Sequence, residues 1–115
     1  MREAAGSIPV TPTILMKLIT LNTWGGKVYQ PLINFIKQHS EDTDIFCFQE
    51  VFKTSTENHD YKGYRLNLYD EISTILNNFH GYFAPTQDNY VFTSEFAEFM
   101  NFDMSWGLAL FVKKV

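Results

Sequence analysis

Hydrophobic and polar positions alternate along residues 16–22, MKLITLN, in the pattern of a short β-strand. This alternation places Leu18, Thr20 and Asn22 on one face of the strand, and the other face carries Lys17, Ile19 and Leu21. A pair of glycines follows shortly after and closes the strand. The pattern therefore predicts a strand that ends on the polar amide of Asn22.

A helix is predicted next, over residues 28–40, because apolar residues recur there at helical spacing, with Pro31 in the first turn. After a polar link, residues 44–50, DIFCFQE, form a second predicted strand. Its apolar run is nearly continuous, as is typical of a central strand covered on both faces. Cys47 lies within this run and is interpreted as a small buried hydrophobic residue.

The residue pattern in the middle of the chain predicts a polar loop followed by a second helix. Residues 53–65 are polar and contain a glycine, and we interpret them as a loop. Apolar residues in helical register predict a helix over residues 69–81, with Asp70 as its N-cap and Gly81 as its C-terminal stop.

The residue pattern in the last third of the chain predicts two strands. Residues 82–85 form a short strand ended by Pro85, and residues 105–115 form a clear apolar strand. Between them, residues 86–104 have no clean period and are expected to be an irregular loop or a short helix over 94–100. The order of strands and helices predicts an α/β fold.

Composition supports one globular unit, either a domain or part of one. The chain has 115 residues, of which 45% are hydrophobic and 19% charged. Residues 1–15 carry glycine and prolines, and we expect a flexible N-terminal arm there, with the folded region over residues 16–115. No run has the length of a membrane span and no signal peptide is indicated, so a cytoplasmic protein is expected.

Charge and cysteine content narrow the classes of function. The formal net charge of -4 gives no electrostatic argument for nucleic-acid binding, which usually needs a basic patch. A metal-assisted phosphodiesterase stays open, because a bound cation supplies positive charge locally. The single cysteine excludes a disulfide within the chain.

Polar side chains stand at the ends of the first two predicted strands. Asn22 ends the first, and Gln49 and Glu50 end the second. A strand–helix–strand crossover brings parallel strands side by side with a shared carboxyl rim, where open α/β sheets bind ligands. A carboxylate there suits Mg²⁺, and an amide beside it can bond phosphate. From the pattern alone, a glutamate after an apolar strand such as Glu50 is usually a solvated strand end, and Asn22 is also interpreted as the start of an Asx turn into Gly25 and Gly26.

The segments ITLNTWGG and DIFCFQEVF together resemble the endonuclease/exonuclease/phosphatase superfamily, which has the DNase-I-like fold. The first segment matches a strand ending in Leu-Asn, and the second matches a strand ending in Gln-Glu-Val. WGLALFVKK, residues 106–114, is similar to the family's next central strand, which opens on a turn containing glycine. The resemblance implies a two-sheet sandwich flanked by helices, of which this chain supplies the first, N-terminal half.

This resemblance also implies the roles of the polar strand ends. Glu50 would be the ligand of Mg²⁺, with Mn²⁺ as the alternative ion. Asn22 would contact phosphate or the metal's water, and Gln49 would support the site or be purely structural. The substrate would be a phosphoester whose class the sequence does not specify.

Two later motifs of the family have no counterpart in this sequence. These are a Gly-Asp-x-Asn-like motif and a Ser-Asp-His-like motif, and none of His39, His59 and His80 stands in the required context. We therefore expect a fragment of a metal-dependent phosphoester hydrolase that needs the C-terminal half of the domain and is inactive alone.

The alternative class of function is a non-catalytic α/β binding or assembly module, including one that forms one half of a split protein. The final apolar strand would then accept a partner strand. A nucleotide binder of the Rossmann type is disfavoured, because the turn NTWGGK lacks the G-x-G-x-x-G pattern. Lys53, His59 and Lys62 lie in the 53–65 loop, and a solvated loop is favoured over substrate contact there.

Overall fold

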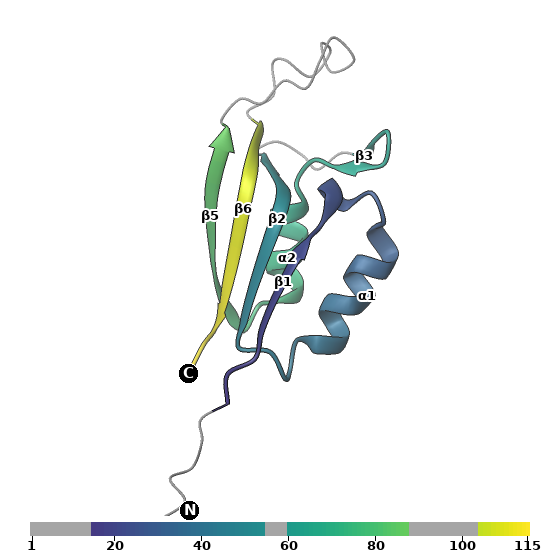
Figure 1. Cartoon of the computed structure of the whole chain (residues 1–115). Helices are drawn as coiled ribbons and strands as arrows, with labels where there is room; N and C mark the ends of the chain where they lie inside the picture. Colours follow the sequence, from purple (N-terminus) through teal and green to yellow (C-terminus); the bar gives the residue numbers. More distant parts are fainter. Residues whose placement is uncertain (1–14, 55–59, 88–103) are drawn as a thin grey trace, which may run out of the picture.

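The computed structural model describes residues 15–54, 60–87 and 104–115 (Figure 1). Its elements follow one another in the order β1 (Leu18–Asn22), a 3₁₀ turn η1 (Trp24–Gly26), α1 (Tyr29–His39), β2 (Ile45–Thr54), β3 (Asp60–Tyr61), β4 (Tyr64–Arg65), α2 (Leu68–Ile75), β5 (Phe79–Gln87) and β6 (Met104–Lys113).

Four of the strands form one mixed sheet in the order β1-β2-β6-β5. β1 and β2 are parallel and are joined through α1, whereas β6 runs antiparallel to both of its neighbours. β3 and β4 form a separate small hairpin. The predicted α/β class is confirmed, and so is the parallel pairing of the first two strands.

One face of the sheet carries the hydrophobic core, because both helices lie on that face (Figure 1). Leu32 and Ile36 of α1 and Ile72 of α2 meet Phe46 and Phe48 of β2 in a single buried cluster. The spacing of the helical residues matches one apolar stripe per helix, which is the pattern expected of a helix that covers a sheet. The core therefore fixes the positions of β1 and β2.

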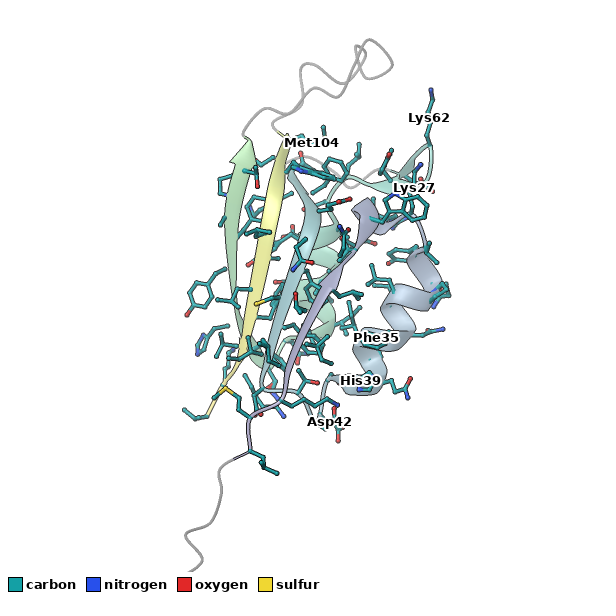
Figure 2. All side chains as sticks on the ribbon, in the orientation of Figure 1. Lys27, Phe35, His39, Asp42, Lys62 and Met104 are labelled. Carbon is teal, nitrogen blue, oxygen red and sulfur yellow. The ribbon has the colours of Figure 1, made fainter. Side chains whose placement is uncertain are left out.

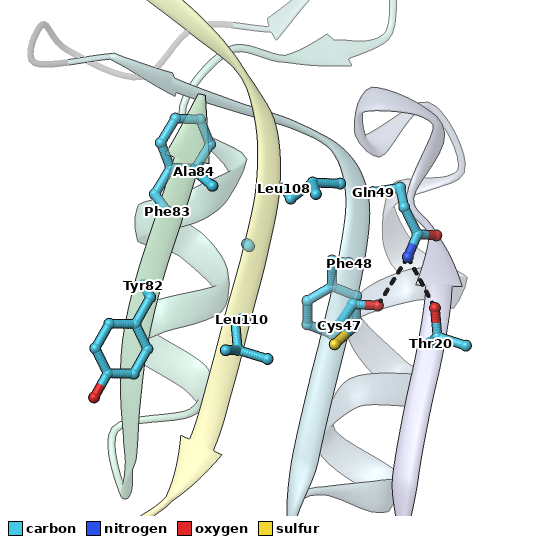
Figure 3. A pocket seen from close by; sticks show the side chains of 10 residues that line it. Thr20, Cys47, Phe48, Gln49, Tyr82, Phe83, Ala84, Leu108 and Leu110 are labelled. Carbon is cyan, nitrogen blue, oxygen red and sulfur yellow. Dashed lines mark hydrogen bonds between the residues drawn. The ribbon is translucent and has the colours of Figure 1, made fainter. Parts of the chain in front are cut away.

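The opposite face of the sheet is open in the part of the chain that the structure describes. Leu108 and Tyr82 are 50% and 56% exposed, and Cys47 is half-buried on this face beside them. Figure 3 shows these side chains around a hollow of about 530 Å³. The prediction that the second strand is covered on both faces is wrong for the described residues, and Cys47 is not fully buried.

The second strand does not end at Glu50. β2 continues to Thr54 and pairs with β6 along that length, so Lys53 and Thr54 belong to a strand and not to the predicted loop. The β3–β4 hairpin occupies the end of the same predicted loop. The continuation was hidden because a polar Gln-Glu pair interrupts the apolar run, which is what a strand end also looks like.

The second helix is shorter than predicted, and both of its predicted ends are wrong. Asn67, not Asp70, occupies the N-cap, and Asp70 instead accepts a hydrogen bond from the Asn67 side chain at 2.9 Å. The helix ends at Ile75, before an Asn-rich turn that favours a reversal of the chain. Gly81 lies inside β5, where a Cβ would meet the Tyr69 hydroxyl at 2.6 Å.

β5 extends well beyond the predicted strand at 82–85. Pro85 does not end it, because β5 is an edge strand whose proline needs no ladder hydrogen bond on the outer side. β6 starts at Met104, and Gly107 lies within this strand instead of in a turn before it. The predictions for residues 1–14 and 88–103, including the helix at 94–100, lie outside the described residues.

No helix in the described part of the chain is both long enough and apolar enough to cross a membrane.

Candidate functional site

Asn22 is displayed at the carboxyl end of β1, on the open face of the sheet. The burial of β1 alternates, and Asn22 falls on the exposed side, as the sequence pattern predicts. Its side-chain oxygen accepts a hydrogen bond from the backbone N–H of Trp24 at 2.8 Å, which is the bond of an Asx turn. Because the side-chain oxygen of Asn22 is used in this turn, its amide nitrogen is the atom that can bond to a neighbouring group.

The chain turns away from the rim through a tightly packed corner. Trp24, Gly25 and Gly26 all have positive φ angles, of 52°, 62° and 80°. A Cβ on Gly25 would meet a ring carbon of Tyr64 at 2.6 Å and the Phe52 ring at 3.0 Å. Glycine is therefore needed here both for the left-handed backbone and for the close approach of the hairpin.

Glu50 lies in a β-bulge. Phe48 pairs with Ala109 and Val51 pairs with Gly107, so Gln49 and Glu50 together oppose a single residue of β6. Glu50 has φ +58°, a left-handed conformation that glutamate rarely adopts. A bulge with one residue in an unusual conformation redirects a side chain, and such bulges are common beside active sites.

The bulge and the Asx turn bring Asn22 and Glu50 together. The Asn22 amide nitrogen donates to one Glu50 carboxylate oxygen at 2.7 Å. Thr23, which is buried, holds the two strand ends in place, since its hydroxyl lies 2.9 Å from the Gln49 carbonyl oxygen and 2.8 Å from that of Glu50. Among the described residues, this arrangement leaves the second carboxylate oxygen of Glu50 and one amide proton of Asn22 for a ligand.

The side chain of Gln49 lies on the sheet surface toward Thr20 and makes no hydrogen bond to Asn22 or Glu50. Its amide nitrogen donates to the Thr20 hydroxyl at 2.8 Å and lies 3.4 Å from the Cys47 carbonyl oxygen (Figure 3). Its backbone carbonyl accepts the Thr23 N–H at 3.0 Å. Any support that Gln49 gives to the site therefore passes through the backbone.

The donor set fits Mg²⁺ only in part. Among the described residues, no three His, Cys, Asp or Glu side chains gather into a metal site. Mg²⁺ usually keeps several waters and binds one or two protein carboxylates together with substrate phosphate. A single outward carboxylate such as Glu50 suits that mode of binding, and it does not suit a closed all-protein cage.

The two described histidines lie away from this pair. His39 is at the C-terminal end of α1, where its ring nitrogen is 3.2 Å from the Lys17 amine near the start of β1. Figure 2 shows His39 and Asp42 at the opposite end of α1 from Lys27. His80 is on β5, in register with Val112. His59 lies outside the described residues.

The lysines of the predicted loop also have structural neighbours. The Lys53 amine lies 5.7 Å from the Tyr69 ring centre, a distance typical of a cation–π contact. Lys62 is exposed on the small hairpin (Figure 2). A further cation, Lys27, directly follows the corner after β1, and its amine lies 4.6 Å from the Tyr64 ring centre and 5.4 Å from that of Trp24.

Sequence reasoning missed the parts of the site that depend on backbone geometry. Thr23 gave no signal beyond its place between Asn22 and Trp24, although it ties the two strand ends together. The bulge at Glu50 was also missed, because a glutamate does not indicate a positive φ.

These observations define a mixed α/β sheet with helices on one face and an amide–carboxylate pair at its rim. Among solved structures, the fold is similar to an endonuclease/exonuclease/phosphatase family protein from Leptotrichia buccalis C-1013-b, with a TM-score of 0.54 and 14% identity. The similarity covers 85% of this chain and 38% of that protein. No known sequence family and no curated protein matches the chain.

At this level of identity the comparison speaks for the fold alone. The chain has the fold of part of a DNase-I-like domain, with one four-stranded mixed sheet and two helices. This agrees with the predicted fold class. The chain spans well under half of the similar protein, so the roles of Asn22 and Glu50 rest on their geometry and chemistry.

Proposed function

We propose that this chain contributes Asn22 and Glu50 to the site of a Mg²⁺-dependent phosphoester hydrolase. The observation that carries the proposal is the 2.7 Å hydrogen bond from the Asn22 amide to a Glu50 carboxylate that stands in a left-handed bulge at the sheet rim. The fold, similar to that of an endonuclease/exonuclease/phosphatase family protein, supports the same reaction class.

Each residue has a definite chemical task in this proposal. Glu50 would hold Mg²⁺, or Mn²⁺, through its outward oxygen. A bound divalent cation would supply Lewis-acid polarisation of a phosphate oxygen. Asn22 orients the Glu50 carboxylate through one amide proton and offers the other to phosphate. Thr23 fixes the spacing of the two strand ends, so that this geometry exists before substrate binds.

The remaining catalytic groups would come from residues beyond this chain. One carboxylate and one amide cannot also supply a general base and a second phosphate contact, and the similar protein is much longer than this chain. We therefore expect little or no hydrolysis by the isolated chain, because such groups work as a unit. Mg²⁺-dependent hydrolysis of a phosphoester by the purified chain would contradict this part of the proposal.

A titration with Mg²⁺ and then Mn²⁺, followed by NMR of the Asn22 side-chain amide and the Glu50 backbone, tests the metal site. We expect chemical-shift changes with Mg²⁺ and line broadening with paramagnetic Mn²⁺ in the wild-type chain and in Glu41→Gln, and neither effect in Glu50→Gln. Glu41 is a matched control because it is an exposed glutamate outside β2. A folded chain whose Asn22 amide never responds to either metal would refute a preformed half-site.

The open sheet face favours a second candidate function, a non-catalytic assembly module. Residues that line its hollow carry no charge, and Leu108 and Tyr82 are half-exposed there. Such a face is typical of a surface that a partner covers. Phosphate and metal titrations separate the two functions, because a pure assembly module has no reason to bind either ligand at Asn22.

A further inference from the structure

A shallow apolar trough of about 280 Å³ begins at Asn22 and runs along one side of α1. Its walls include Trp24 from the corner after β1 and Val28, Pro31 and Phe35 from the start and side of the helix. None of the residues that line the trough carries a charge. Asn22 belongs both to this lining and to the pair with Glu50, so the trough is continuous with the candidate site.

An apolar stripe runs beside the exposed polar positions of α1, which include Gln30, Asn34 and Lys37. Val28 at the N-cap and Pro31 and Phe35 of the helix are spaced i, i+3 and i+7, so they form a stripe. This stripe adjoins the buried Leu32, which also lines the trough. The stripe is about 10 Å long, from a rise of about 1.5 Å per residue. Val28 is 49% exposed, which leaves this surface open to a ligand.

The backbone of Trp24 is fixed at the head of the trough, and its side chain is 55% exposed. Its φ of +52° is unusual for a bulky residue. The bond from its N–H to Asn22 and the close packing of Gly25 under Tyr64 fix this conformation. A fixed backbone that directs a large aromatic side chain toward solvent lowers the cost of ordering this part of the site on binding.

Apart from one amide proton of Asn22, which the proposed function assigns to phosphate, the polar side-chain groups of the trough are already engaged. The Asn22 side chain bonds Trp24 and Glu50, and the Thr23 hydroxyl lies within hydrogen-bonding distance of two backbone carbonyls. A nucleobase has several polar edge atoms that would find few partners here. A hydrocarbon chain needs none, and it gains free energy from leaving water.

We propose that the trough seats the alkyl chain of an amphiphilic phosphoester whose phosphate lies at Asn22 and Glu50, and this rests on the proposed function. Trp24 and Val28 are the specificity-determining residues, because they form the exposed walls next to the phosphate end. Lys27, beside the Trp24 ring, adds positive charge near the headgroup. The substrate class is therefore a phosphate ester that carries an apolar chain.

Fluorescence of Trp24 tests this proposal, because the chain has two tryptophans and Trp106→Phe leaves Trp24 as the only one. The probes are alkyl phosphates of increasing chain length, used as monomers with Mg²⁺ present. We expect a blue shift of Trp24 emission, with each added methylene tightening binding between about twofold and fourfold. Fourfold corresponds to about 0.8 kcal/mol per buried CH₂. Alkyl phosphates that bind only to the open sheet face would leave the Trp24 emission unchanged.

Two variants carry the control. In the Trp106→Phe background, Val28→Glu places a charge in the trough and should abolish the dependence on chain length. Gln30→Glu adds the same charge at an exposed position of the first turn that does not line the trough, and it should retain that dependence. Both acidic residues suit the N-terminal end of a helix, so folding is expected to be kept, as circular dichroism would verify.

The outcomes separate this proposal from the proposed function. Emission that ignores chain length, or that responds more to a nucleoside monophosphate than to an alkyl phosphate, would overturn the alkyl site. That result would leave a metal response at Asn22 intact. Equal binding of alkyl glucosides and alkyl phosphates, unaffected by Glu50→Gln, would show an adventitious apolar site and would overturn the link to a phosphoester.

Discussion

Glu50 is one of three described non-glycine residues with a positive φ, together with Trp24 and Lys62. A left-handed backbone costs a non-glycine residue roughly 1–2 kcal/mol, and the neighbouring strands impose it here. Surrounding structure tolerates such strain most often where a side chain must point in one direction. The Asn22 hydrogen bond offsets only part of this cost, because it lies at the exposed rim.

A comparison of two variants measures the strain at Glu50. Glu50→Ala and Glu50→Gly both remove the carboxylate, but only glycine accepts a φ of +58° without a steric penalty. We expect the glycine variant to have the larger free energy of unfolding, by about 1 kcal/mol, in urea denaturation. Equal stability of the two variants would mean that the bulge relaxes when the carboxylate is lost.

At this scale the sequence predicted the neighbourhood of the site but not its geometry. Parallel pairing of β1 and β2 follows from the crossover pattern, so a shared rim for Asn22 and Glu50 was predictable. The bulge was not, since no residue type in the stretch FQEV signals an extra residue in the ladder. The roles of Asn22, Glu50 and Gln49 stay predictions until metal binding is measured.

Asp42 gives a prediction of pH dependence at the far end of α1. A hydrogen bond from the Lys17 amine, 2.9 Å away, lowers the pKa of Asp42 below its ordinary value of 3.8. A lowered pKa in the folded state means that the contribution of Asp42 to stability is present above the unfolded pKa. It is lost as the pH falls through the folded pKa.

Carboxyl NMR titration of Asp42 checks this prediction. The midpoint should lie below 3.8 in the wild-type chain and return toward that value in Lys17→Met. Asp42→Asn should remove the corresponding part of the acid dependence of unfolding. An unchanged midpoint in Lys17→Met would show that the ion pair does not persist in solution.

At the scale of elements, a polar cluster joins α1, α2 and the β3–β4 hairpin. Glu71 of α2 accepts hydrogen bonds from the Tyr29 hydroxyl at 2.8 Å and from the Arg65 guanidinium at 2.6 and 3.0 Å. The guanidinium also lies 4.2 Å from the Tyr29 ring centre. Burial and the bond to Glu71 raise the pKa of Tyr29, and the same carboxylate raises the pKa of Arg65.

Replacing Glu71 should weaken this junction. Glu71→Gln keeps the shape of the side chain but leaves Arg65, whose side chain is only 24% exposed, without its partner charge. We expect a loss of about 1.5–3 kcal/mol in the free energy of unfolding, the usual range for hydrogen bonds to charged groups. Glu41→Gln, at an exposed position, should change stability by less than about 0.5 kcal/mol. Equal effects of the two variants would contradict a stabilising role for the cluster.

The boundaries of the elements show where sequence patterns lose information. The central parts of α1, β1 and β6 were predicted because their apolar spacing has a single period. The end of α2 was missed because Phe79 fits the helical register and yet serves the core as the first residue of β5. Tertiary packing decided that boundary, and local pattern alone does not contain it.

At the scale of the whole molecule, the sheet is covered on one face only in the described residues. The helices bury Phe46, Phe48 and Phe111 on that face, whereas Leu108 and Leu110 project from β6 toward β2 on the other (Figure 3). Two sheets that pack face to face bury such a surface at a spacing of about 10 Å. The open face therefore has the character of one layer of a sandwich, in agreement with the similarity to part of a longer protein.

This uncharged face should make the isolated chain associate. In Leu108→Lys combined with Leu110→Lys, each new ammonium would be buried in any assembly across the face, at a cost that association cannot meet. The monomer should lose no more than about 1 kcal/mol, because these side chains are 50% and 37% exposed already. Light scattering over a range of concentrations should show oligomers of the wild-type chain and monomers of the double variant.

Asn34→Lys, on the exposed side of α1, adds a comparable charge away from the sheet and should still form oligomers. A wild-type chain that stays monomeric at every concentration and binds no hydrophobic dye would mean that residues outside the described ranges already cover the face.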